Sequence, residues 1–243
     1  MYRQALLALI LLGCSAGTAV KPAPSPPQPA YAYQGAEISY TPGQESRCRA
    51  FGCFGGFDHP KLASFEERFV KDVPRNLEGL VQVVRRDGDM QKRMSAIQLL
   101  GYASGREQLV ALLLPFVRDK QEGVRNETLR MLGDAQHHAQ TVVLPLETIL
   151  DAMWMPRETD RNKSTWALVR IVEVEGPAHA REIAQKSGDV LVSMVGMSQD
   201  IDATPARLLL EAISGERHGN DRGAWRQWVE KTGGRPVRPL AGN

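Results

Sequence analysis

A nine-residue pattern occurs twice in the middle of the chain, at a constant spacing of 32 residues. It runs from Arg93 to Gly101 and again from Arg125 to Gly133. Each copy has arginine first, alanine or threonine fourth, apolar residues fifth and eighth, and glycine ninth. A third copy, Arg161 to Val169, follows after 36 residues and lacks the glycine. Apolar residues three positions apart share one face of a helix, so the pattern predicts a repeated helical unit.

Each patterned helix follows another apolar segment. These segments are Leu77 to Arg85, Leu109 to Val117 and Val142 to Trp154. The small fourth residue allows a neighbouring helix to approach closely, and we expect the glycine to end the helix in a left-handed cap. Helix pairs of this kind bury their apolar faces only against the next pair. The sequence therefore predicts an all-α fold, an α-solenoid of antiparallel helix pairs over residues 65–232, with an irregular helical bundle as the alternative.

The second patterned helix resembles the second helix of a HEAT repeat. That helix reads V-R-x-x-A-x-x-x-L-G in short bacterial repeats similar to the phycobilin-lyase type. Val124 to Gly133 matches best, Lys92 to Gly101 is next, and the resemblance covers roughly residues 74–215. It implies a HEAT-like scaffold, and it does not imply lyase chemistry. It also implies that the repeated arginine pairs with an acidic residue near the preceding turn, for which the candidates are Asp89, Glu122 and Asp160.

The first 13 residues have the pattern of a secretory signal. The apolar segment Ala5 to Leu12 is eight residues long, far short of the roughly 20 residues that a membrane-spanning helix needs. Gly13 and Cys14 resemble the processing site of a bacterial lipoprotein, in which the cysteine carries acyl chains such as palmitate. Ser15 resembles the residue found in lipoproteins that are passed on to the outer membrane. We therefore expect residues 1–13 to be a signal peptide and the mature protein to be lipid-anchored at Cys14, facing the periplasm.

A proline-rich stretch and two further cysteines follow. Five of the ten residues from Lys21 to Ala30 are proline, which lacks the N–H of regular structure, so residues 14–45 are predicted to be a disordered tether. With the first cysteine lipidated, Cys48 and Cys53 form an even pair in an oxidising compartment. This predicts a disulfide that closes a small loop within the Cys- and Gly-rich residues 46–64. A metal or redox site at the two cysteines is the alternative.

The C-terminal part has two tryptophans on one predicted helix. Trp225 and Trp228 are three positions apart and share a face, and Asn220 or Asp221 is suited to cap the start of that helix. The D-x-x-x-W-x-x-W pattern looks like the last helix of many bacterial HEAT-repeat proteins. We expect the two rings to seal the open end of the array, with stacking on a ligand as the alternative, and residues 233–243 to form a flexible tail.

Composition excludes some functions without selecting one. The chain is 42% hydrophobic and 24% charged with a net charge of +2, which is typical of one soluble domain without the field that attracts nucleic acid. No phosphate loop, dinucleotide-binding glycine pattern or zinc-protease motif occurs. The adjacent His137 and His138 point about 100° apart on a helix and do not suit one metal. We therefore expect no cofactor, no metal and no nucleic-acid partner.

These features together predict a membrane-anchored scaffold or assembly factor that binds another envelope protein. Basic residues of the second helices are expected near one face of the array, toward an acidic partner. These residues are Arg93, Arg125, Arg130, Arg161 and Arg170. One alternative is an enzyme or enzyme subunit of the envelope that uses the loop between Cys48 and Cys53 or a groove in the array. Another is a lipoprotein that spaces the membrane from a neighbouring layer.

Overall fold

The computed structural model describes residues 49–52, 60–137 and 139–233, and within them the chain is all-α. No helix in this part of the chain combines the length and apolar character needed to cross a membrane. The α-helices are α2 (Pro60–Asp72), α3 (Leu77–Arg86), α4 (Met90–Leu100), α5 (Arg106–Leu113), α6 (Glu122–Gln136), α7 (Leu146–Ala152), α8 (Glu158–Glu175), α9 (Ala180–Val195), α10 (Asp200–Ser214) and α11 (Arg222–Lys231). The 3₁₀ helices are η1 (Val73–Arg75), η2 (Leu114–Phe116) and η3 (Gly176–His179).

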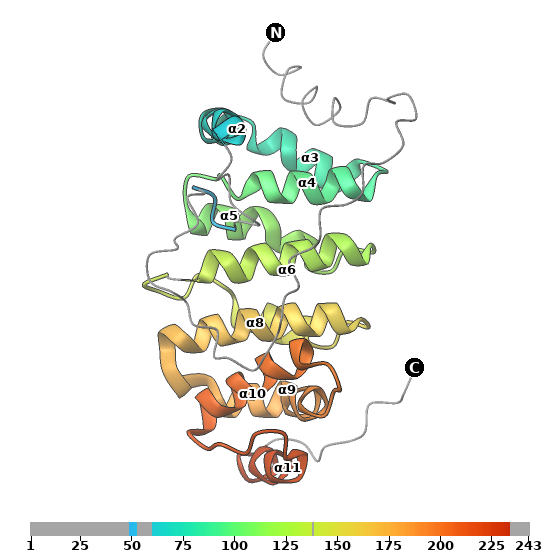
Figure 1. Ribbon diagram of the computed structural model, residues 1–243, viewed down its shortest axis with the longest axis vertical. Coiled ribbons are helices and arrows are strands. Elements are labelled where there is room, and N and C mark those ends of the chain that lie inside the picture. Colours follow the sequence, from blue (N-terminus) through green and yellow to red (C-terminus); the bar gives the residue numbers. More distant parts are fainter. Residues whose placement is uncertain (1–48, 53–59, 138, 234–243) are drawn as a thin grey trace.

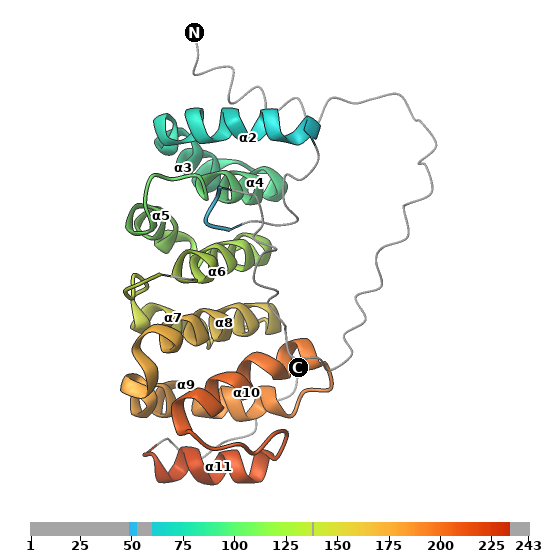
Figure 2. The same ribbon diagram turned by 60° about the vertical axis from the view of Figure 1, so that its left-hand side comes forward.

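The helices pack in successive pairs. The pairs are α3 with α4, α5 with α6, α7 with α8 and α9 with α10. The second helices of the pairs contact one another in order, α4 to α6, α6 to α8 and α8 to α10, and we call them the second-helix row. On the other side α9 contacts both α7 and α11. Helix α2 lies at one end of the stack and α11 at the other (Figures 1 and 2).

The repeated pattern places its apolar positions in the core. Ile97 and Leu100 of the first copy and Leu129 and Leu132 of the second have no exposed surface. The third copy substitutes threonine at its fifth position, and Thr165 is equally buried. Its hydroxyl donates to the backbone carbonyl of its own helix four residues earlier, at 2.7 Å. Burial of the matched positions shows that the three copies face the interior in the same register.

The glycine that ends two copies of the pattern does not form the left-handed cap that we predicted. Gly101 has φ of −56°, and Gly133 lies inside α6. A Cβ on Gly133 would lie 3.8 Å from the Ala167 backbone of α8, and one on Gly101 would lie 3.3 Å from the Met131 side chain. The small residue therefore serves close packing between successive second helices. The left-handed conformation occurs instead at Gly215, with φ of 72°, after α10.

The helical region also begins earlier than predicted. Helix α2 starts at Pro60, which falls inside the segment 46–64 that was expected to be a loop. Proline is tolerated in the first helical turn because the N–H that it lacks has no partner there. The last helix ends at Lys231, one residue before the predicted boundary. Residues 1–48, which include the predicted signal and the whole predicted tether, lie outside the described residues, as do Cys53 and the tail after residue 233.

Candidate functional site

Arg93, which begins the first copy of the pattern, is buried, with 4% of its surface exposed. Its Nε donates to the Val84 carbonyl of α3, and its guanidinium pairs with the Asp119 carboxylate and donates to Gln121 at 2.7 Å. Burial acts to raise the pKa of Asp119, but the hydrogen bonds from Arg93 and from the Gln121 backbone together with the nearby positive charges outweigh it, so the pKa of Asp119 is lowered. Asp119 precedes α6, so Arg93 joins one helix pair to the next.

Arg125 makes the equivalent connection from α6 to α8. Its Nε and Nη2 donate to the Asp160 carboxylate, with the shortest distance 2.8 Å, and Nη1 donates to the Asp119 carbonyl at 2.9 Å. Arg125 is 5% exposed and Asp160 has no exposed surface. Asp160 lies 35 residues after its partner, so the acidic group comes from the following helix pair. Both ends of this ion pair are therefore removed from solvent.

The three predicted acidic partners have different roles. Asp160 pairs with Arg125 of the preceding helix pair. The prediction was that each acidic residue would pair with the arginine that follows it in the same unit, and for Asp160 this is wrong. Asp89 instead caps α4 by accepting from the backbone N–H of Gln91 at 2.8 Å. Glu122 pairs with Arg157 at 3.2 Å, where both side chains are largely exposed. The local turn could not supply the partner because the arginine side chain reaches across to the next layer.

In the third copy the connection to the next helix pair is made by the amide of Asn162 and not by the arginine. Arg161 is half-buried and donates to backbone carbonyls just before its own helix, among them that of Met155 at 3.4 Å. The neighbouring Asn162 donates to the Ile201 carbonyl at 2.8 Å and to the Asp202 carboxylate at 3.1 Å. Successive second helices are thus joined by a ladder of polar contacts. Arg93 and Arg125 belong to that ladder and not to the partner-binding surface on which we expected them.

Two of the five predicted arginines, Arg130 and Arg170, lie on a shared surface of α6 and α8. Arg130 and Asp134 are one turn apart on α6, and Lys163, Trp166 and Arg170 follow at helical spacing on α8. All five side chains are half-buried. We call these five residues the α6–α8 face. The Arg170 guanidinium lies over the Trp166 ring at 5.6 Å from its centroid and pairs with Glu173 at 2.6 Å.

Electrostatic effects within the α6–α8 face show that its charged groups are close together. Burial raises the pKa of Asp134 to about 6, against the opposing effect of Arg130 and Arg170. Burial also lowers the pKa of Lys163, and the positive charge of Arg130 lowers it further. The Lys163 ammonium has no hydrogen bond or ion pair within the described part of the chain. Sequence reasoning missed Lys163 and Trp166, although their spacing with Arg170 was a usable signal.

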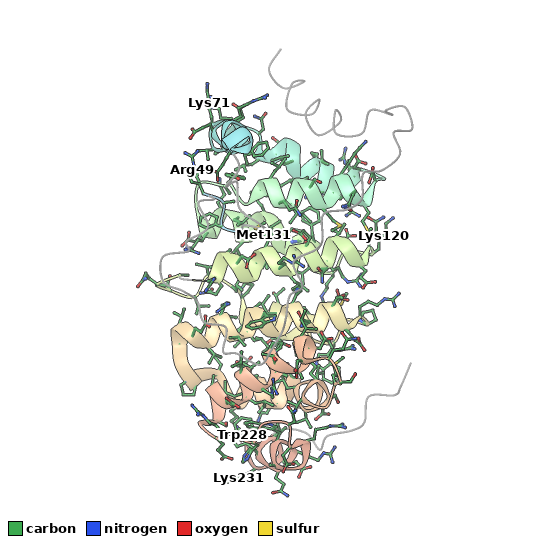
Figure 3. The ribbon with its side chains drawn as sticks, viewed as in Figure 1. Arg49, Lys71, Lys120, Met131, Trp228 and Lys231 are labelled. Atoms are coloured by element: carbon green, nitrogen blue, oxygen red, sulfur yellow. The ribbon has the colours of Figure 1, made fainter. Side chains whose placement is uncertain are left out.

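Residues 49–52 pack against the start of the array, between α2 and α6. The Arg49 amide donates to Glu66 at 2.6 Å, and the Phe51 amide donates to the Gly101 carbonyl at 2.9 Å. The Arg106 guanidinium lies 5.1 Å from the centre of the Phe51 ring. Arg49 lies beside α2, while Met131 lies in the middle of the stack (Figure 3). These are the four residues between the cysteines, but Cys48, Cys53 and Cys14 themselves lie outside the described residues.

Gly52 reaches the interior at the far end of this segment. A Cβ on it would lie 2.7 Å from the sulfur of Met131 and 2.9 Å from an oxygen of Asp134. Such distances are too short for any side chain, so only glycine fits without displacement of the neighbours. The segment therefore contacts Asp134, a member of the α6–α8 face, and helps to bury it.

The two C-terminal tryptophans lie inside the last layer. Trp225 has no exposed surface and Trp228 has 9%, and their rings meet edge to face at 6.5 Å. The Trp225 indole N–H donates to the Gly219 carbonyl at 3.0 Å, and Asp221 caps the helix start by accepting from two backbone N–H groups. Figure 3 shows Trp228 on α11 at the end of the stack. Their burial is the arrangement that capping requires and leaves no open ring face for a ligand at Trp225.

Metal binding has no support in the described residues, where no group of three His, Cys, Asp or Glu side chains is placed to hold an ion. His137 follows the end of α6, and His138 lies outside the described residues. No protein-family model matches the sequence, and no curated protein or solved structure matches it. The function is therefore argued from the geometry of the array and of the α6–α8 face.

Proposed function

We propose that the protein is a lipid-anchored scaffold or assembly factor of a bacterial envelope, which binds another envelope protein through a HEAT-like solenoid. The resemblance of Val124 to Gly133 to a HEAT helix and the layered packing of the pairs support the solenoid. The lipoprotein pattern at Cys14 supports an anchor in the outer membrane, facing the periplasm. The observation that carries the binding role is the α6–α8 face, where cationic side chains and an aromatic ring lie together on the second-helix row.

The polar ladder supports a role in which the array keeps its shape. Arg93 and Arg125 each join one helix pair to the next through groups that are buried or nearly so. Breaking a buried pair by removing one partner is costly, so sliding of one pair against the next is opposed. A stiff row of second helices holds its surface residues in fixed positions. Preorganised surfaces bind with less loss of conformational entropy, which suits a scaffold.

The loop between Cys48 and Cys53 fits best as a structural element. Its four inner residues are held by α2, the Gly101 turn and α6, so a disulfide across them constrains a segment that is already in place. We expect the Cys48→Ser, Cys53→Ser double variant to melt at a lower temperature, with a loss under about 3 kcal/mol, while partner binding is retained. Loss of function at unchanged melting temperature is the result that favours redox chemistry instead.

Site-specific photo-crosslinking in intact envelopes tests the binding role. A photoreactive residue is placed at Gln98 or Leu208, which are exposed on the second-helix row, and at Ala111 or Gln227, which are exposed on α5 and α11. The scaffold proposal expects one envelope protein to be captured from the first two positions and not from the other two. Capture of the same protein from all four positions, or from none, contradicts it.

The anchor is tested separately. Cells that express the protein are grown with a radioactive fatty acid, and the mature chain is expected to carry the label. The Cys14→Ser variant is expected to lose it, and the protein is then released from the membrane fraction. An unlabelled wild-type protein overturns the assignment of the anchor and of the compartment together.

A further inference from the structure

We infer that the α6–α8 face binds a carboxylate-bearing, partly apolar segment of the partner protein, and that Lys163 is the cation that anchors it. This inference rests on the proposed scaffold function and adds the chemistry of the partner. It is carried by a juxtaposition that the sequence did not reveal, in which three cationic side chains and one tryptophan from two neighbouring helices share one surface.

Lys163 lacks the partner that a half-buried ammonium normally has. Buried charges in proteins are usually paired, because removing them from water costs free energy that a hydrogen bond or an opposite charge must offset. Within the described residues Lys163 makes no hydrogen bond and no ion pair, and the carboxylates of Asp134, Asp202 and Glu127 act on its charge without direct contact. By contrast Lys186, on α9, pairs with both Glu147 and Glu182. A ligand carboxylate placed at Lys163 supplies the missing hydrogen bonds.

The carboxylates nearest to Lys163 are occupied or withdrawn. Glu127 is 3% exposed and accepts a hydrogen bond from the Gln98 amide at 3.1 Å. Asp202, on α10, accepts from Asn162 at 3.1 Å. Asp134 is half-buried against Gly52, and with its pKa raised to about 6 it is neutral only below that pH. Lys163 is thus the cation of this face whose charge is met by no hydrogen bond or ion pair within the described residues.

Trp166 adds an apolar contact between the cations. It lies one turn before Arg170 and one turn after Lys163, and the Arg170 guanidinium stacks on its ring. An indole ring offers a large contact area with few rotatable bonds, and tryptophan and arginine are the residue types most often found at the centre of binding surfaces. A segment with apolar side chains between its acidic residues matches this alternation of charge and ring. A purely polyanionic ligand leaves the ring without a partner.

Binding at this face is coupled to the charge of Lys163. The charged groups that act on it are Glu127, Arg130 and Asp134 of α6 and Asp202 of α10, and Arg170 of α8 acts in turn on Asp134. An incoming carboxylate favours the ammonium form, so binding raises the pKa of Lys163. The affinity is therefore expected to fall as the pH rises through the lowered pKa of Lys163. If the anchoring group were a surface lysine with an ordinary pKa, the affinity would fall only at a higher pH.

The first experiment compares the chemical reactivity of two lysines in the full mature chain. Acetic anhydride modifies neutral amines, so at pH 8 Lys163 is expected to react faster than Lys186, whose pKa is raised by the hydrogen bond that it donates to Glu147. The probe is a synthetic 12-residue peptide of Glu, Leu and Phe. It is expected to slow acetylation of Lys163 at least fivefold and to leave Lys186 unchanged. Equal protection of both lysines, or of neither, overturns the inference.

The second experiment measures affinity by isothermal titration with three peptides. The mixed Glu, Leu and Phe peptide is expected to bind more than tenfold better than the same peptide with Lys in place of Glu, and better than polyglutamate. Lys163→Gln is expected to reduce its affinity about tenfold, and Lys163→Glu further. The matched control Lys186→Glu leaves the affinity within twofold. If Lys163→Glu fails to fold, the Gln variant and the acetylation of wild type still decide the outcome.

Two other occupants of the face are distinguished by the same measurements. If Lys163 is protected in the free protein and the Glu37→Gln, Glu45→Gln double variant exposes it, the chain's own N-terminal segment is the ligand and the inference is overturned. Self-association that disappears in Lys163→Glu, measured by sedimentation, identifies a second copy and overturns it too. Capture of a partner from Gln98 and Leu208 with no effect of Lys163→Gln leaves the scaffold function standing and rejects this inference alone.

Discussion

Removing the Asp160 carboxylate is the sharpest test of how the helix pairs are held together. Asp160→Ala leaves the Arg125 guanidinium in a site with 5% of its surface exposed and takes away three of its hydrogen-bond contacts, at 2.8 to 3.1 Å. Loss of one partner of a buried ion pair costs about 3 to 5 kcal/mol, because the remaining charge is uncompensated. For a chain of this size that loss corresponds to a fall in melting temperature on the order of 10 °C.

The assay is urea denaturation, monitored by the circular dichroism of the helices. The control is the loss of the same kind of carboxylate from an ion pair that is exposed to solvent. Arg118 and Asp151 form an ion pair at 2.6 Å with side chains 65% and 48% exposed, so Asp151→Ala is expected to cost at most about 1 kcal/mol. A non-polar replacement of the whole buried pair, Arg125→Met with Asp160→Leu, is expected to recover most of the lost stability. The reasoning is refuted if Asp160→Ala and Asp151→Ala cost the same.

Two further predictions concern burial and close packing. Because burial raises the pKa of Asp134 to about 6 from its ordinary value of 3.8, folding favours its protonated form. The resulting stability is present below about pH 4 and is lost as the pH rises through 6. Wild type should therefore lose roughly 3 kcal/mol relative to Asp134→Asn over that range, as measured by urea denaturation at each pH, and parallel curves would contradict the assignment. A Cβ on Gly188 would lie 2.5 Å from Val229 of α11, so Gly188→Ala should cost about 1 to 3 kcal/mol. Gly79→Ala meets nothing within 4 Å on its helix and should stabilise by about 0.5 to 1 kcal/mol in the same melts; a reversed order of the two variants would show that the clash is absent.

The helical repeat was accessible to sequence reasoning because its signal is local. Apolar residues at the fifth and eighth positions of the pattern must share a helix face, and Ile97 and Leu132 are accordingly buried. The helix start at Asp221 was equally local, since a capping carboxylate acts on N–H groups two and three residues away. The predicted role of the repeated glycine was wrong, because a helix cap and a close contact between helices both favour glycine and the sequence does not distinguish them.

The candidate site depended on relations that no local pattern contains. Arginine at the first position of the pattern gave no indication that Arg125 would be buried against Asp160, 35 residues later, while Arg130 and Arg170 remained at the surface. Lys163 has an ordinary helical context and was passed over. The pKa of Lys163 is lowered by burial and by Arg130 on another helix. This lowering therefore arises only when the two helices are packed together.

The sequence by itself determined that the chain forms consecutive helices with one apolar face each, because helix periodicity and capping involve neighbours within about four residues. It also determined the lipoprotein pattern and the pairing candidates among the cysteines, which remain predictions. The tertiary structure decided which polar groups are joined, through the stacking of one helix pair on the next. Electrostatic interactions and desolvation depend on distance in space, so only the packed array separates the buried arginines of the ladder from the half-buried cations of the α6–α8 face.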